Sequence, residues 1–154
     1  MQVSDLVRAP DRALRQSVRG KTKDFFYTSA PVTVAAITGL VLGQTQTRIN
    51  IDGDAHFICT GITGQYLVQT TGFKTKPQLY AEPEIQIQEE GKGFQLFDRP
   101  LRWNLIVGVG QRSSVLDPPY FFNSRSTVLV TFGNPETLAY TCTVTLNGYK
   151  LYLR

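Results

Sequence analysis

Alternation of apolar and polar residues recurs along most of the chain after residue 24, and it predicts β-strands. Residues 138–146 (LAYTCTVTL) place an apolar side chain at almost every second position, the pattern of a strand with one face on a core. Residues 84–89 (EIQIQE) show the same pattern, with Ile85 and Ile87 predicted to point inward. Residues 47–62 also alternate, and Asp52-Gly53 predicts a turn within them.

The pattern changes near the end of the chain. After Asn147-Gly148 the apolar positions move by one residue, to Tyr149, Leu151 and Leu153. A β-bulge or a tight bend at the glycine would produce such a slip. We therefore expect the last strand to lie in the centre of a sheet and to contain an irregularity at this point.

The remaining segments complete an all-β prediction. DFFYTSAPVTVAA predicts one or two strands broken at Pro31, and EEGKGFQLF predicts a hairpin. LRWNLIVGV gives no clear pattern, and SVLDPPYFFNSRS predicts a proline-rich loop before a strand from Val128 to Phe132. About eight strands and little helix favour an all-β fold, an antiparallel β-sandwich that is jelly-roll-like.

Charge divides the chain into two parts. Residues 1–23 hold six basic residues against two acidic ones, and their net charge of +4 equals that of the whole chain. We call residues 1–23 the N-terminal arm and predict that it is extended and basic, while residues 24–154 form the β-sandwich domain. A short helix over residues 11–19 is compatible with the weak apolar stripe of Ala13, Leu14 and Val18. The basic residues of the arm are Arg8, Arg12, Arg15, Arg19, Lys21 and Lys23.

Three roles for the arm are open. Its arginines and lysines could pair with acidic residues in a groove of a neighbouring subunit, which is the interpretation that we favour. They could instead neutralise nucleic-acid phosphates in a salt-sensitive way, although no aromatic residue for base stacking precedes Phe25. A solvated tail without a partner is the third interpretation.

A second candidate site is the aromatic run Tyr120, Phe121 and Phe122. Three adjacent side chains cannot all face one core, because neighbours in a strand point to opposite sides. At least one is expected to be exposed or to cover an edge. The run therefore predicts either a partner-binding surface or a cap that closes one end of the sandwich.

The residues that carry most catalytic chemistry are sparse. His56 is the single histidine, and Glu82, Glu84, Glu89 and Glu90 are best explained as a solvated face and a turn. Cys59 and Cys142 lie inside apolar alternation and are expected to be buried free thiols in a reducing compartment. No zinc, calcium or phosphate-loop spacing occurs. We expect a protein that is not an enzyme, needs no cofactor, and is soluble without a signal peptide or membrane span.

Several segments resemble small virion structural proteins of tailed bacteriophages. The resemblance covers residues 24–153 and rests on DAHFICTGI, on GFQLFD, on PPYFFNSRSTVLV, and on AYTCTVTLNGYKLY at the end. These motifs are structural rather than catalytic, and the N-terminal arm is not part of them. The resemblance implies a jelly-roll-like capsid decoration (cement) protein, with the major capsid protein as its partner. It further implies self-association as a dimer or trimer, synthesis in the bacterial cytoplasm, and location in the virion.

Two alternatives follow from the same residues. One is a head-fibre, collar or tail-adaptor component of the virion. The other, from a different class, is a glycan-binding β-sandwich module, because aromatic faces stack on sugars and the chain offers Trp103, Tyr120, Phe121 and Phe122.

Overall fold

The computed structural model describes residues 22–69, 81–92, 94–108 and 114–152. In this part of the chain the structure is almost entirely β, with one four-residue helix, α3. In chain order the elements are β1 (Thr22–Thr28), β2 (Val32–Val34), β3 (Gly43–Asn50), β4 (Ala55–Val68), β5 (Glu84–Glu89), β6 (Phe94–Gln95), β7 (Leu101–Arg102), α3 (Trp103–Ile106), β8 (Ser114–Phe122), β9 (Thr127–Asn134) and β10 (Tyr140–Tyr152).

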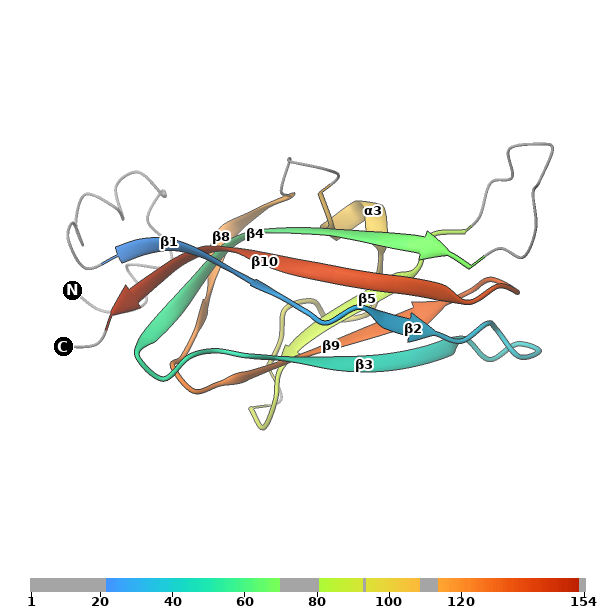
Figure 1. Cartoon of the computed structure of the whole chain (residues 1–154), viewed down its shortest axis with the longest axis horizontal. Coiled ribbons are helices and arrows are strands. Elements are labelled where there is room, and N and C mark those ends of the chain that lie inside the picture. The colour runs from blue at the N-terminus through green and yellow to red at the C-terminus, as the bar shows by residue number, and fades with distance from the viewer. Residues whose placement is uncertain (1–21, 70–80, 93, 109–113, 153–154) are drawn as a thin grey trace.

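The strands form two five-stranded antiparallel sheets that pack face to face (Figure 1). The first sheet has the order β1-β10-β4-β8, with β2 also paired to β10. The second sheet has the order β3-β9-β5-β6, with β7 also paired to β5. Their facing sides hold the main hydrophobic core, so the predicted antiparallel β-sandwich is confirmed.

The pairing order is that of a jelly roll. Strands β1 and β2 follow one another along the same neighbour, β10, and act as one interrupted strand. Strand β3 pairs with β9, β4 with β8 and β5 with β6, so early segments pair with late ones in nested order. The chain is thus a long antiparallel ribbon folded over itself, which confirms the jelly-roll-like prediction.

Strand β10 lies between β1 and β4, as predicted for the last strand. Its inward side chains Tyr140, Cys142, Val144 and Leu146 are fully buried. A central strand is paired on both sides, so its backbone hydrogen bonds are satisfied along its whole length.

The predicted irregularity at Asn147-Gly148 is confirmed, but the extra residue lies in the neighbouring strand. Asn147 pairs with Gly61 and Gly148 with Cys59, so Thr60 of β4 is the unpaired residue of the bulge. A side chain on Gly148 would have its Cβ 1.8 Å from the Ile58 carbonyl oxygen, which explains the glycine. Strand β4 therefore changes which residues face the core, while β10 does not.

The prediction of a loop at the two prolines is wrong. Residues Ser114–Phe122 form β8, which is the edge strand of the first sheet. Pro118 and Pro119 lie where the β4–β8 register is irregular, and an edge strand tolerates proline because its outer N–H groups need no sheet partner. The ambiguous segment LRWNLIVGV forms β7 and α3, which place Trp103 and Ile106 in the core.

Candidate functional site

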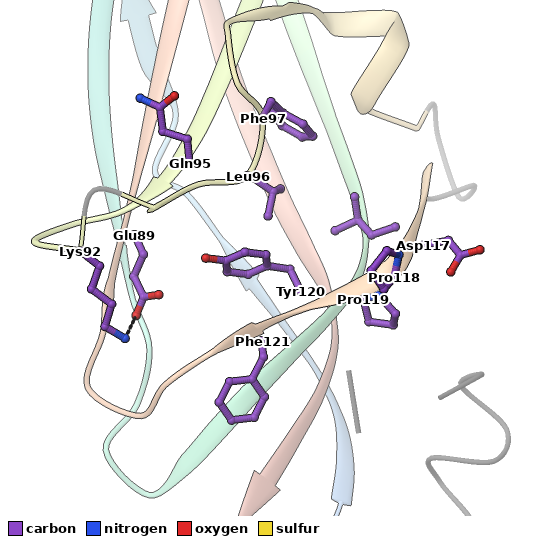
Figure 2. A pocket seen from close by; sticks show the side chains of 11 residues that line it. Glu89, Lys92, Gln95, Leu96, Phe97, Asp117, Pro118, Pro119, Tyr120 and Phe121 are labelled. Atoms are coloured by element: carbon purple, nitrogen blue, oxygen red, sulfur yellow. Dashed lines mark hydrogen bonds and ion pairs between the residues drawn. The ribbon is translucent and has the colours of Figure 1, made fainter. Parts of the chain in front are cut away.

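A cleft opens between β8 at the edge of the first sheet and the β5–β6 hairpin of the second (Figure 2). We call it the edge cleft. Its volume is about 680 Å³, within the usual size of small-ligand pockets. The lining residues are Glu89, Lys92, Gln95, Leu96, Phe97, Leu116, Asp117, Pro118, Pro119, Tyr120 and Phe121.

The walls of the edge cleft are mainly apolar. Leu96, Phe97, Leu116 and Tyr120 are half-buried and pack against the main core with one side. The cleft is thus a part of the sandwich interior that stays open because β6 has only two residues and β8 is irregular at its prolines. Such a surface gains free energy when a partner covers it.

A buried carboxylate lies at one side of the edge cleft. Glu89 is 4% exposed, and Lys92 Nζ donates to its Oε1 across 2.8 Å. A carboxylate removed from water needs such a partner, because its desolvation is otherwise costly. The interpretation of Glu89 as part of a solvated turn is therefore wrong. The sequence did contain a signal, since Ile85, Ile87 and Glu89 share the inward face of β5.

Tyr120 points from β8 into the edge cleft, on the side toward Glu89 (Figure 2). Burial raises the pKa of its phenol, and the negative charge of Glu89 raises it further. The hydroxyl is therefore protonated at neutral pH and presents a neutral polar group beside an aromatic face.

The structure separates the three predicted aromatic residues. Tyr120 lines the edge cleft, Phe121 packs with Ile58 on the opposite side of the sheet, and Phe122 is 1% exposed in the main core. This alternation follows from their consecutive positions in one strand. Of the three, Tyr120 points its ring into the edge cleft, Phe121 borders the cleft but packs with Ile58, and Phe122 lies in the main core.

The predicted contact residues of the arm lie at or beyond the limit of the described chain. Lys23 is an exposed residue of β1. Arg8, Arg12, Arg15, Arg19 and Lys21 fall outside the described residues, so their role stays a prediction.

His56 and the two cysteines have structural surroundings. The Ser124 backbone N–H donates to His56 Nδ1 over 3.0 Å, and burial lowers the pKa of this imidazole. Cys59 and Cys142 are free and buried, as predicted, and burial raises the pKa of each thiol to about 12. These thiols are therefore poor nucleophiles.

Trp103 is not available for stacking on a ligand. Its indole is buried, and it lies against Tyr66 and Phe132 with ring centroids 5.5 Å and 6.2 Å away. The suggestion that Trp103 contributes to a sugar-binding surface is therefore wrong.

The residues described by the structure contain no group of three or more His, Cys, Asp or Glu side chains that could hold a metal ion. Among these same residues, no helix has the length and apolar character needed to cross a membrane. Comparison of the chain with protein-family models, curated protein sequences and solved structures gave no match.

Proposed function

We propose that this protein is a non-enzymatic structural protein of a phage virion, and that it decorates and stabilises the capsid by binding major capsid protein subunits. The observation that carries the proposal is the nested jelly-roll pairing of β1–β10, β3–β9 and β4–β8. Viral capsid proteins and lectins commonly use this fold. The pairing agrees with what the phage resemblance implies, although a fold alone does not fix a function.

The edge cleft and the arm supply two different kinds of contact. Covering Leu96, Phe97 and Tyr120 would give a short-range apolar contact. The arginines of the arm would give a charge contact that weakens with salt. A protein that binds assembled shells but not free subunits stabilises the shell by mass action, and many symmetric copies add their effects.

The test is cosedimentation of the full-length chain with nuclease-treated phage heads that lack it, at low and high salt. A Tyr120→Ala variant tests the edge cleft, and Phe26→Ala is its control because Phe26 is an exposed aromatic away from the cleft. We expect Tyr120→Ala to bind about ten-fold more weakly at both salt concentrations, since buried aromatic contacts contribute about 1–2 kcal/mol.

The arm is tested in the same assay with Arg8, Arg12, Arg15 and Arg19 changed to Gln, and with Arg99 and Arg102 changed to Gln as the control. The arm variant should lose affinity at low salt and differ little from the native protein at high salt. Equal binding by all variants would remove both contacts from the proposal. No binding of the native protein to heads would favour the collar, head-fibre or tail-adaptor alternative.

A glycan-binding module is the second candidate function, because the edge cleft combines an aromatic face at Tyr120 with a carboxylate at Glu89. Sugar sites use such stacking faces together with a few fixed hydrogen-bonding groups. A glycan array should then give a hit that Tyr120→Ala abolishes. An array without signal above background would exclude this candidate.

A further inference from the structure

Strand β3 is an edge of the second sheet, because it pairs with β9 on one side only (Figure 1). This pairing runs from Gly43 to Asn50 without a register shift. In the next pair of the same register, the Ile51 N–H donates to the Ser126 carbonyl oxygen over 2.9 Å. Hydrogen-bonded pairs alternate along an antiparallel ladder. The backbone groups of the odd-numbered residues of β3 therefore point to β9, and those of the even-numbered residues point outward.

Four residues of β3 present their backbone groups at this edge, and their side chains are exposed. They are Gln44, Gln46, Arg48 and Asn50. Within the described part of the chain, the structure shows no hydrogen bond from these four N–H groups to another residue. A row of unpaired N–H and C=O groups is a template on which a further strand can pair.

The other described strands at sheet edges carry features that hinder the addition of a strand. Strand β8 contains two prolines and an irregular register, β2, β6 and β7 have three residues or fewer, and β1 carries Lys23 and Asp24. Strand β3 contains no proline and no bulge. Its one charged residue, Arg48, is paired with Glu90 of the same chain over 3.0–3.3 Å. Strand β3 therefore lacks the usual protection of an edge.

We propose that β3 pairs antiparallel with β3 of a second copy of this chain, across a two-fold axis at Thr47. This register places Gln46 of each copy opposite Arg48 of the other, and Gln44 opposite Asn50. All outward residues of both strands then form hydrogen-bonded pairs. No like charges lie opposite each other, and the amide side chains of Gln44 and Asn50 can each donate and accept a hydrogen bond. The strand is thus complementary to itself in backbone, side chains and charge.

This contact sets the number of copies at two. The same strand is used on both molecules, so the interface is isologous and leaves no β3 edge for a third copy. The second sheets of the two molecules become one continuous sheet. Strand pairing alone buries less surface than a standard protein interface, so the dimer should dissociate on dilution. The pairing does not rest on the proposed function, because it concerns only the purified chain.

Analytical ultracentrifugation of the full-length chain, at concentrations from about 1 μM to about 1 mM, tests the dimer. We expect a monomer–dimer equilibrium. Gln46→Pro removes one outward N–H from each copy and keeps the bonds to β9, so it should weaken the dimer about ten-fold or more. Gln46→Thr keeps the N–H and should dimerise like the native protein, and Trp103 fluorescence reports whether each variant is folded. A native protein that stays monomeric or forms trimers would overturn the proposal, as would unchanged dimerisation of folded Gln46→Pro.

A pair of cysteine variants tests the register and needs no proline. The two Thr47 residues form a non-hydrogen-bonded pair with Cα atoms about 4.5 Å apart, a separation that a disulfide can span. Thr47→Cys should therefore give a covalent dimer under mild oxidation. Thr45→Cys is the control, because residue 45 is half-buried on the same face but lies opposite Ile49 of the second copy. The native cysteines are buried and should not cross-link. A covalent dimer of Thr45→Cys, or none of Thr47→Cys, would overturn the proposal.

Discussion

Lys150 Nζ lies 2.5 Å from Asp52 Oδ2, and the lysine side chain is only 7% exposed. The ammonium group is also 4.1 Å from the centroid of the Phe25 ring and 3.6 Å from Asp54 Oδ1. Tyr27 donates its hydroxyl hydrogen to the same Asp52 oxygen over 3.1 Å. A nearly buried cation is thus held at one end of the sandwich by a carboxylate from the β3–β4 turn.

Removing the charge of Asp52 should destabilise the fold. Asp52→Asn leaves Lys150 buried with a weaker partner, and we expect a loss of about 1–3 kcal/mol in the free energy of unfolding. Urea unfolding followed by Trp103 fluorescence measures it. Asp98→Asn, at an exposed position, is the control and should change stability by about 0.5 kcal/mol or less. Equal effects of the two substitutions would contradict this role of Asp52.

The Lys150–Asp52 ion pair also predicts how the free energy of unfolding changes at acidic pH. The hydrogen bond from Lys150 lowers the pKa of Asp52. The Asp52 carboxyl group therefore binds a proton more readily in the unfolded chain than in the folded one. The contribution of ionised Asp52 to the free energy of unfolding is complete above its unfolded pKa of about 3.9. It is lost as the pH falls from about 4 through the lower pKa of the folded state. Unfolding midpoints of the native protein and of Lys150→Met between pH 2 and 7 should show a smaller acid loss in the variant.

At alkaline pH, the stability that Lys150 contributes decreases as the pH rises. Burial lowers the pKa of Lys150, but its hydrogen bond to Asp52 and the nearby negative charges outweigh burial and raise it overall. This contribution is fully present below the unfolded pKa of about 10.4 and is lost as the pH rises through the folded pKa. Asp52→Asn should therefore bring the alkaline loss of stability to lower pH. An unchanged alkaline midpoint would contradict the coupling.

Gly148 should tolerate no side chain. An added Cβ would meet the Ile58 carbonyl oxygen at 1.8 Å, so Gly148→Ala must separate β10 from β4 locally. We expect a loss of about 3 kcal/mol or more. Gly133→Ala in β9 is the control, because the nearest atom to its added Cβ is at an ordinary 3.5 Å. A Gly148→Ala protein as stable as Gly133→Ala would show that the register at the bulge is different.

The three adjacent aromatic residues should differ in their contribution to stability. Phe122→Ala removes a fully buried ring and is expected to cost about 3–5 kcal/mol. Tyr120→Ala should cost less, because its ring is half-buried and faces the edge cleft. Chemical denaturation of both variants measures the order. A larger loss for Tyr120→Ala would mean that this side chain belongs to the core rather than to a binding surface.

The two thiols should be unreactive in the folded protein. With both side chains fully buried and pKa values of about 12, a thiol-specific reagent at pH 8 should modify neither Cys59 nor Cys142 at an appreciable rate. Both should react rapidly in concentrated urea. Fast reaction of one thiol without denaturant would reveal local opening of β4 or β10.

The sequence by itself determined most of the segments that become strands, with β8 as the exception, and which side chains of a regular strand face the core. Period-two alternation is a local property, so Ile85 and Ile87 of β5, and Cys142 and Val144 of β10, could be placed inward. The position of the irregularity at Gly148 was readable for the same reason. The sequence also shows directly that positive charge is concentrated in the arm. The partner of the arm stays a prediction.

The tertiary structure alone decided where non-local contacts form. The prolines of β8 predicted a loop, but the free side of an edge strand accommodates them, and edge position depends on the pairing of the whole sheet. Tyr149 points outward by the unbroken alternation of β10, but Ile58 lies beside it on the same face only because of the extra residue Thr60 in β4. The edge cleft and the Lys150–Asp52 pair join residues from distant segments. Local periodicity cannot specify such contacts, because they exist only once the two sheets have packed.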